Sequence, residues 1–334
     1  MELRWFGRAG IRVSELCLGA MTFGRECDEA QSHALLDCFI EAGGNFIDTA
    51  NAYATGVSES FIGRYLAAHP GLRNRLVIAT KFRRPMSQDP NDLGNSRRHI
   101  RIAVEDSLRR LGSDWIDLYQ SHAWDERTPL EETLSTLDAL VREGKVRYVG
   151  VSNFAGWHIA KALGLAQLHH WEPFVSVQPE YSLLERGAER EILPLCASEG
   201  LAAIPWSPLA GGLLTGKYVD GAPPATGTRG ADSTPQAAIV HHHARNPRLV
   251  STLEAVRAVA AETGRGAAQV ALNWVLHRPA VTAPIVGART VAQLRDNIGA
   301  TGWRLAPEQM QRLTQASDFE VGYPYRSISL SNPR

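Results

Sequence analysis

Eight short apolar runs alternate with helical patterns along almost the whole chain. Between the runs, apolar residues recur at helical spacing and the connections are mostly short. Eight strands that each precede a helix are typical of a parallel (β/α)8 barrel, the TIM barrel of the α/β class. The pattern therefore predicts one barrel domain over residues 1–334. The runs cover residues 16–18, 45–47, 76–79, 115–119, 146–149, 174–177, 201–204 and 283–286.

A doubly wound sheet is the competing α/β architecture. It would carry a G-x-G-x-x-G sequence after its first strand, where glycines let the backbone approach a pyrophosphate. Residues 19–24 read Gly-Ala-Met-Thr-Phe-Gly and do not match. The barrel is therefore the preferred interpretation. Two strand-like pieces in residues 1–15 predict a β-hairpin lid, and helical patterns after residue 286 predict additional C-terminal helices.

The sequence also marks where some helices begin and end. Residues 128–131 (Thr-Pro-Leu-Glu) predict a capping box with proline at the first helical position, and Gly144 would end that helix. Residues 290–293 predict a second capping box. A last helix is expected to begin at Pro307, and the tail from Tyr323 onward, which has no periodicity, is expected to lie over the barrel.

Composition narrows the possible partners. The chain has 35 Lys and Arg against 35 Asp and Glu, so its formal net charge is zero, which predicts no binding to nucleic acid or to an anionic membrane. No apolar run approaches the roughly 20 residues of a membrane helix, and the start does not resemble a signal peptide. The four cysteines have no metal or redox spacing. We expect a cytoplasmic protein without a metal, and the sequence leaves its oligomeric state open.

Polar side chains stand at or just after the ends of three successive strands. They are Asp48 with Tyr53, then Lys81, then His122. In a barrel these ends share one face, so the four side chains are expected to converge. An ammonium favours the phenolate and lowers a phenol pKa from its usual value of about 10. A carboxylate can hold the lysine, and an imidazole can orient a carbonyl oxygen. The set suits proton delivery to a carbonyl oxygen, with a nicotinamide cofactor as the hydride donor.

Each of the four residues also has a purely structural interpretation. Asp48 could cap a helix, Lys81 could be solvated, and Tyr53 and His122 could be packing residues. Taken singly, these interpretations are the more common ones. Their occurrence at consecutive strand ends favours the catalytic interpretation.

Several sequence blocks occur in order along nearly the whole chain: residues 18–24, 46–50 with Tyr53, 80–82, 119–122, 144–154, 178–181, 206–218 and 287–297. Together these blocks resemble the aldo-keto reductases. The resemblance implies a (β/α)8 barrel that reduces an aldehyde or ketone to an alcohol with NADPH. It implies that Tyr53 is the general acid, that Lys81 lowers its pKa while pairing with Asp48, and that His122 directs the carbonyl.

The resemblance further implies a set of residues that bind NADPH. Four would contact the nicotinamide: Ser152, Asn153 and Gln178 at the carboxamide and Trp206 stacked on the ring. The others implied are Gly19, Ala20, Met21 and Asp48 near the nicotinamide ribose, Ser207, Pro208, Leu209, Ala210, Gly211 and Lys217 over the pyrophosphate, and Gly287, Arg289, Gln293 and Asn297 at the adenosine end.

Arg289 makes physical sense as a phosphate ligand. It precedes a predicted helix N-terminus, which is a ready anion site, and a guanidinium binds phosphate bidentately. We therefore expect NADPH to be preferred over NADH, with Arg289 at the 2′-phosphate. Some branches of the family place a lysine and a second arginine where this chain has Gly287 and Gln293, which would make the preference modest.

The substrate is less constrained than the cofactor. Phe23, Phe82 and Trp124 follow strand ends and are candidates for an apolar cup around a carbonyl, with packing beneath loops as an equal alternative. Arg83 and Arg84 could bind a phosphorylated or nucleotide-linked substrate, although such a pair is more often a solvated face.

A long Gly- and Pro-rich stretch, residues 208–247, contains His241, His242 and His243. We expect a lid or a mobile polar loop. A zinc site is not expected, because consecutive histidines cannot all face one ion in regular structure.

Two alternative functions remain open at this point. The first is a catalytically weak NADP(H)-sensing subunit, because residues 206–218 also resemble the potassium-channel β subunits. The second is a sugar keto-reductase or alcohol dehydrogenase that acts on a dedicated biosynthetic intermediate. A sugar-phosphate isomerase or hydrolase would need a carboxylate base or pair, which Asp48 alone does not supply. Turnover of a carbonyl well above cofactor decay would exclude the sensing subunit.

Overall fold

The computed structural model describes residues 1–217 and 235–331. Eight parallel strands form one sheet in which consecutive strands are neighbours and β10 pairs with β3. A parallel bridge from Ala203 to Val281 joins β9 to the segment before β10 and closes the sheet. This order confirms the barrel and excludes a doubly wound sheet, whose strand order reverses. The strands are β3 (Cys17–Gly19), β4 (Phe46–Asp48), β5 (Val77–Phe82), β6 (Ile116–Ser121), β7 (Val146–Ser152), β8 (Ser176–Gln178), β9 (Ala202–Ala203) and β10 (Ile285–Val286).

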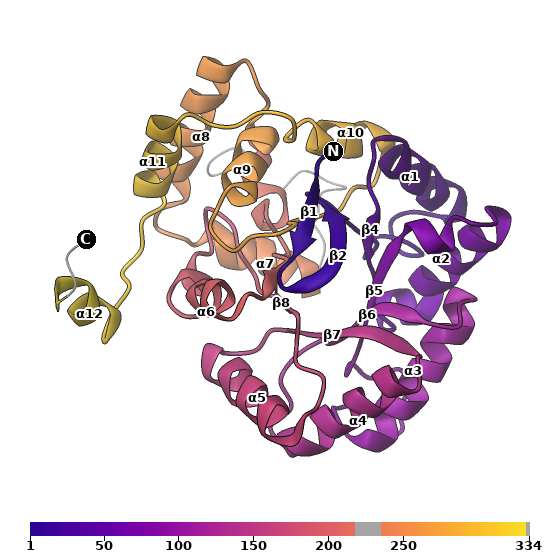
Figure 1. The fold of residues 1–334 in the computed structure, drawn as a ribbon. Helices are drawn as coiled ribbons and strands as arrows, with labels where there is room; N and C mark the ends of the chain where they lie inside the picture. Colours follow the sequence, from indigo (N-terminus) through magenta and orange to yellow (C-terminus); the bar gives the residue numbers. More distant parts are fainter. Residues whose placement is uncertain (218–234, 332–334) are drawn as a thin grey trace.

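Helices surround this sheet, as Figure 1 shows. Their buried faces and the outward side chains of the strands form one large apolar cluster, while a smaller cluster fills the barrel interior. The helices are α1 (Glu29–Glu41), α2 (Val57–Ala68), α3 (Arg97–Leu111), α4 (Leu130–Arg142), α5 (Gly156–His169), α6 (Ile192–Glu199), α7 (Pro235–Ala244), α8 (Leu249–Thr263), α9 (Ala267–Leu276), α10 (Val291–Ile298), α11 (Pro307–Ala316) and α12 (Tyr325–Ser331), with short 3-10 turns η1 (Tyr53–Gly56), η2 (Arg73–Arg75), η3 (Gly187–Glu189) and η4 (Ala210–Thr215).

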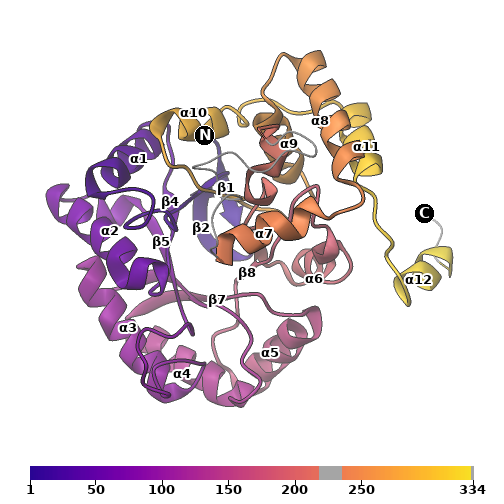
Figure 2. The ribbon, with the colours of Figure 1, turned by 180° about the vertical axis from the view of Figure 1, so that it is seen from behind.

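An antiparallel hairpin, β1 (Leu3–Phe6) and β2 (Ala9–Ser14), confirms the predicted lid. Phe6 packs edge-on against Phe46, with ring centroids 5.5 Å apart, and the Arg8 N–H donates to the Gly200 carbonyl at 2.8 Å. Phe46 and Gly200 lie at the N-terminal ends of β4 and β9, so the hairpin closes the end of the barrel where the strands begin. Figure 1 looks onto this end and Figure 2 onto the opposite one, where the strands finish.

The helix-end predictions hold only in part. Gly144 follows the C-cap of α4 with φ +77°, as expected for a helix stop. The capping box at 128–131 is wrong, because Pro129 is itself the N-cap and the Thr128 hydroxyl donates to Asp125 at 2.7 Å. At α10, the Thr290 hydroxyl accepts from the Gln293 N–H, but the Gln293 side chain accepts from Arg289 instead of completing the box.

The C-terminal tail differs from the prediction. Pro307 begins α11, but α12 follows it, so α11 is not the last helix. Figures 1 and 2 show α12 beyond the helices that surround the barrel, on the side of α6. The Tyr325 hydroxyl donates to Glu191 at the start of α6. The tail is therefore partly helical and lies beside the barrel instead of over it.

The stretch from 208 to 247 contains η4 and α7, with residues 218–234 outside the described part of the chain. The three histidines lie on α7, and His243 is 1 % exposed and 2.9 Å from a Glu180 carboxylate oxygen. The prediction of a mobile loop is therefore wrong for the histidines. Within residues 1–217 and 235–331, no three metal-ligating side chains come together, and no helix is long and apolar enough to cross a membrane.

Candidate active site

Three of the four predicted catalytic side chains form one hydrogen-bonded chain at the strand ends. Asp48 is the last residue of β4, Lys81 lies near the end of β5, and Tyr53 opens η1. The Lys81 Nζ lies 2.5 Å from Asp48 Oδ1, 2.8 Å from the Thr49 carbonyl and 3.2 Å from the Tyr53 hydroxyl. Lys81 and Asp48 are buried, whereas Tyr53 is partly exposed. The ammonium is thus fixed by two acceptors and presented to the accessible phenol.

Two glutamine amides complete the environment of Asp48. Its Oδ2 accepts from Gln120 Nε2 at 3.2 Å and from Gln178 Nε2 at 2.9 Å. Both glutamines are buried. Sequence reasoning missed Gln120, although a glutamine two residues before His122 in the same strand run was an available signal. The two amides thus satisfy the Asp48 oxygen that Lys81 does not contact.

His122 follows β6 and lies beside Tyr53. Its N–H donates to the Phe82 carbonyl at 3.1 Å, and its ring meets the Tyr53 ring edge-on with centroids 5.8 Å apart. Burial holds the pKa of His122 well below 6.5, and the charges of Lys81 and Arg84 lower it further. The ring is therefore neutral at pH 7. Its Nδ1 is buried without a partner among the described residues, and a buried N–H without an acceptor is costly. We therefore assign the proton to Nε2.

The pKa of Tyr53 departs from the expectation. Burial raises it above 10 and Lys81 lowers it, with a net shift upward. Lys81 thus acts in the predicted direction, but the prediction of a lowered pKa is wrong for this structure because desolvation outweighs the ammonium. Burial alone would lower the pKa of Lys81, but the effects of Asp48 and Tyr53 outweigh burial and raise that pKa. The site therefore holds a protonated phenol beside a charged ammonium at neutral pH.

Asn153 links the ends of three strands. It lies just after β7 with φ +55°. Its Nδ2 donates to the His122 carbonyl at 2.9 Å and to Ser152 Oγ at 3.0 Å, and its Oδ1 accepts from Trp206 Nε1 at 3.2 Å. Its amide is therefore occupied within the protein. Gln178 differs, because Asp48 takes its Nε2 while its Oε1 is not buried and bonds to no described group. Gln178 thus offers a free acceptor to a ligand such as a carboxamide.

The other residues predicted for the cofactor lie along the same edge of the barrel, from β9 through β10 to β3. At residues 207–211, Ser207, Ala210 and Gly211 have φ of +56°, +48° and +67°, and Ser207 Oγ accepts from the Gly211 N–H at 3.2 Å. Leu209 (φ −105°, ψ 14°) is followed by the left-handed Ala210, and such a pair turns successive backbone N–H groups toward one side, as in anion-binding loops. Pro208 is buried, Leu209 is partly exposed and Lys217 is exposed.

The β3 and β10 segments continue that edge. Gly19 and Ala20 are buried and Met21 is partly exposed. The Ala20 N–H donates to the backbone carbonyl of Asp48 at 2.8 Å, which ties the residue after β3 to the end of β4.

Arg289 precedes α10, and its guanidinium lies 3.7 Å from Glu26. Gly287 is exposed and its carbonyl accepts from Asn297 at 3.4 Å. The half-buried Trp206 indole, the free Gln178 oxygen, the turn at 207–211 and the Arg289 cation together fit a phosphorylated dinucleotide.

The apolar cup is only partly supported. Phe23 and Phe82 have no accessible surface, and Phe82 packs on Tyr119 in the layer between strands and helices, with centroids 4.8 Å apart. These two predictions are therefore wrong. Trp124 is partly exposed and stacks on His158 at 3.8 Å with ring planes 8° apart. Of the three aromatic residues, it alone offers surface to a ligand.

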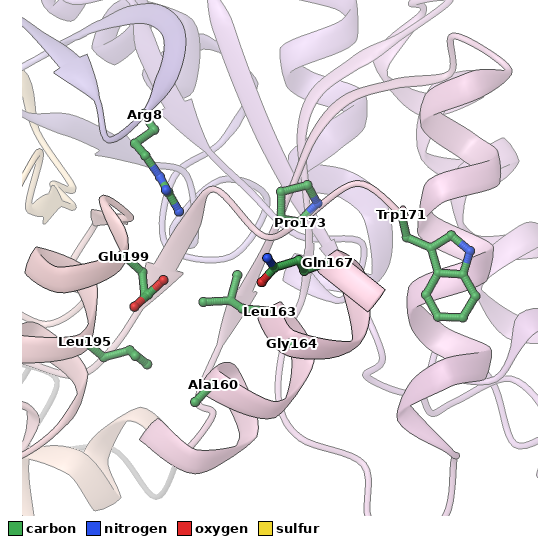
Figure 3. Close-up of a pocket in the computed structure, with 9 residues that line it drawn as sticks. All are labelled: Arg8, Ala160, Leu163, Gly164, Gln167, Trp171, Pro173, Leu195 and Glu199. Atoms are coloured by element: carbon green, nitrogen blue, oxygen red, sulfur yellow. The ribbon is translucent and has the colours of Figure 1, made fainter. Parts of the chain in front are cut away.

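A cavity of about 490 Å³ lies elsewhere, between α5 and α6. Figure 3 shows Arg8 extending from the hairpin over the helices that carry Gln167 and Glu199. None of the predicted site residues lines it, and Arg8 belongs to the closed end of the barrel. We therefore place the candidate active site at the strand ends and not in this cavity.

Known proteins resemble this chain over nearly its whole length. The model of the Aldo/keto reductase family matches residues 15–318. An uncharacterised oxidoreductase of Bacillus subtilis, YrpG, is 44% identical over 94% of this chain and 95% of its own length. Norsolorinic acid reductase of Aspergillus flavus is 35% identical over 95% of this chain and 81% of its own length. Aryl-alcohol dehydrogenase [NADP(+)] of Phanerodontia chrysosporium is 35% identical over 95% of this chain and 86% of its own length.

Proposed function

The chain belongs to the aldo/keto reductase family, and from this premise we propose that it uses NADPH to reduce an aromatic aldehyde or ketone to the alcohol. The observation that carries the proposal is the contact chain from Asp48 through Lys81 to the accessible Tyr53 hydroxyl. It joins a proton donor to a buried cation at the strand ends, where barrel enzymes carry out their chemistry.

The reaction needs one hydride and one proton. NADPH, when bound, supplies the hydride to the carbonyl carbon. Tyr53 donates its hydroxyl proton to the carbonyl oxygen, and Lys81 at 3.2 Å stabilises the phenolate that remains. Asp48 keeps Lys81 charged and in place. Neutral His122, with its proton on Nε2, donates a hydrogen bond that orients the carbonyl oxygen. Tyr53 is then reprotonated from solvent.

NADPH is proposed as the cofactor on two grounds. Arg289 stands before the N-terminus of α10, where a guanidinium and the helix dipole together favour a phosphate. The dehydrogenase from Phanerodontia chrysosporium is named for NADP(+). Trp206, Gln178 and the turn at 207–211 would hold the nicotinamide and pyrophosphate parts.

An aromatic substrate is proposed from the Trp124 surface. Trp124 is two residues beyond His122, and its N–H lies 3.4 Å from the Asn153 carbonyl. It stacks on His158 and meets Phe154 edge-on at 5.3 Å, so this partly exposed ring is held in place near the histidine that is proposed to orient the carbonyl. The printed names of the norsolorinic acid and aryl-alcohol relatives support the same substrate class.

Loss of NADPH absorbance with a panel of aryl aldehydes tests the proposal. Tyr53→Phe should lower kcat by roughly 10²–10⁴-fold, the usual share of a general acid, without weakening NADPH binding measured by quenching of tryptophan emission. Tyr323→Phe is the matched control, because Tyr323 is 85% exposed. Unchanged kcat in Tyr53→Phe would contradict the mechanism. NADPH binding without turnover of any carbonyl would favour a sensing subunit.

A further inference from the structure

Arg83 and Arg84 follow β5 directly and begin beside His122. The backbone N–H of His122 donates to the carbonyl of Phe82, the residue before Arg83. Arg83 has φ +97°, a strained backbone conformation for a residue other than glycine. Two hydrogen bonds hold it there: the Gly94 N–H to the Arg83 carbonyl at 2.9 Å, and Arg83 Nη2 to the Trp124 carbonyl at 3.1 Å. The chain is thus fixed where Arg84 leaves the strand end.

The two guanidinium groups differ in their surroundings. Arg83 is partly buried and donates a hydrogen bond to the Trp124 carbonyl. The Asp125 carboxylate lies close enough to Arg83 for the arginine's charge to lower the Asp125 pKa. Arg84 is exposed and has no hydrogen bond or ion pair with any residue in the described ranges 1–217 and 235–331. Its charge nevertheless acts on the pKa of both His122 and Tyr53, after the larger effects of burial and Lys81. Arg84 is therefore a cation that lies close to His122 and Tyr53 and has no partner in the described chain.

Three cations stand at or just after the end of β5, and Arg84 is the one among them without a carboxylate partner in the described chain. Lys81 is paired with Asp48, and Arg83 has Asp125 nearby, which leaves Arg84. One guanidinium matches one carboxylate, which it can bind bidentately, whereas a phosphate carries about −1.5 to −2 charges at pH 7.

We propose that Arg84 binds a carboxylate on the carbonyl substrate, so that this reductase prefers aromatic oxo acids. The inference rests on the proposed carbonyl reduction and adds the substrate's second recognition group. Arg83 serves as a positioning residue, because it fixes both the backbone before Arg84 and the carbonyl of Trp124.

The test compares 4-carboxybenzaldehyde with its methyl ester, methyl 4-formylbenzoate. The two share ring, aldehyde and an electron-withdrawing para group but differ in charge. In the wild type, KM for the acid should be lower than for the ester. In Arg84→Ala, KM for the acid should rise on the order of tenfold, since a hydrogen bond to a charged group contributes about that factor, while KM for the ester stays constant. Arg84→Lys should recover part of the loss.

Arg75→Ala is the matched control. Arg75 is exposed, has no side-chain partner in the described chain, and lies in η2 at the opposite end of β5, roughly 20 Å away. The Arg75→Ala substitution removes the same charge as Arg84→Ala but far from the site, so KM for both aldehydes should stay unchanged. Equal shifts for acid and ester in Arg84→Ala, or an equal shift in Arg75→Ala, would overturn the proposal.

A direct binding measurement separates this inference from the proposed function. Tryptophan quenching by 4-(hydroxymethyl)benzoate and by its methyl ester needs no turnover. Tighter binding of the acid that disappears in Arg84→Ala supports the carboxylate site even if no aldehyde is reduced, in which case the proposed function fails alone. Equal binding of acid and ester in the wild type refutes the carboxylate site even if the aldehydes are reduced.

Discussion

Replacing Lys81 by methionine isolates the buried charge on which the site depends. The substitution keeps an unbranched side chain of similar length but removes the ammonium. Lys81 is 0% exposed, and its Nζ contacts Asp48 Oδ1 at 2.5 Å. In Lys81→Met the Asp48 carboxylate keeps its two amide donors, Gln120 and Gln178, but loses its only cation in the described chain. A buried carboxylate is left without a counter-charge.

The magnitude follows from the distance and the burial. At 2.5 Å and an effective dielectric constant of about 20, two unit charges attract by roughly 7 kcal/mol. Burying the ammonium in the wild type costs several kcal/mol of desolvation, which offsets part of that attraction. Methionine carries no charge and avoids this cost. Breaking a buried pair by removing one partner typically costs about 3–5 kcal/mol. We expect the free energy of unfolding of Lys81→Met to fall by that amount.

Equilibrium urea unfolding, followed by tryptophan fluorescence and by far-ultraviolet circular dichroism, measures the loss. Asp48→Asn/Lys81→Met should recover a large part of it, because removing both charges leaves no unpaired ion. Lys145→Met is the control: that lysine is on the surface with ion pairs to Glu105 and Glu143, and a change within about 1 kcal/mol is expected. A loss below 1 kcal/mol in Lys81→Met, or a double variant less stable than the single one, would refute the reasoning.

Three further predictions follow from the same structure. Arg289→Ala should raise KM for NADPH on the order of tenfold and leave KM for NADH unchanged, and equal effects on both cofactors would exclude contact with the 2′-phosphate. Burial holds the pKa of His122 below 6.5 and that of Tyr53 above 10. Between these two pKa values His122 stays neutral and Tyr53 stays protonated, so kcat measured from pH 6 to 9 should be flat. An inflection near pH 6.5 would contradict a neutral His122. Gly63→Ala should lower the free energy of unfolding by about 1–3 kcal/mol, because a Cβ there would meet the Arg110 carbonyl oxygen at 2.2 Å, and an unchanged urea midpoint would show that α2 and α3 separate easily.

Predictions from the sequence were correct where a pattern repeats along the chain, or where the geometry of the barrel brings side chains together. Each of the eight apolar runs overlaps a strand of the sheet. Because parallel strands end on the same face of a barrel, strand-end positions alone were enough to bring Asp48, Tyr53, Lys81 and His122 together.

The errors arose where one residue had two possible partners or two possible faces. Thr128 could cap α4 or bond to Asp125 three residues earlier, and the structure shows the bond to Asp125 at 2.7 Å. Phe82 follows Lys81, and consecutive strand residues point to opposite faces, so the lysine that faces the site turns the phenylalanine into the outer layer. That alternation was readable from the sequence. The pairing of His243 with Glu180 was not, because 63 residues separate them.

The sequence by itself determined the barrel, the family and the four residues at the strand ends, because these depend on periodicity and on local spacing. Only the tertiary structure decided how those residues are charged. Three features depend on desolvation and on contacts between distant strands. They are whether burial or Lys81 dominates the pKa of Tyr53, which amides reach Asp48, and which of the two arginines after β5 lacks a counter-ion in the described chain. These electrostatic terms have no local sequence signature, since they are fixed only when the barrel closes.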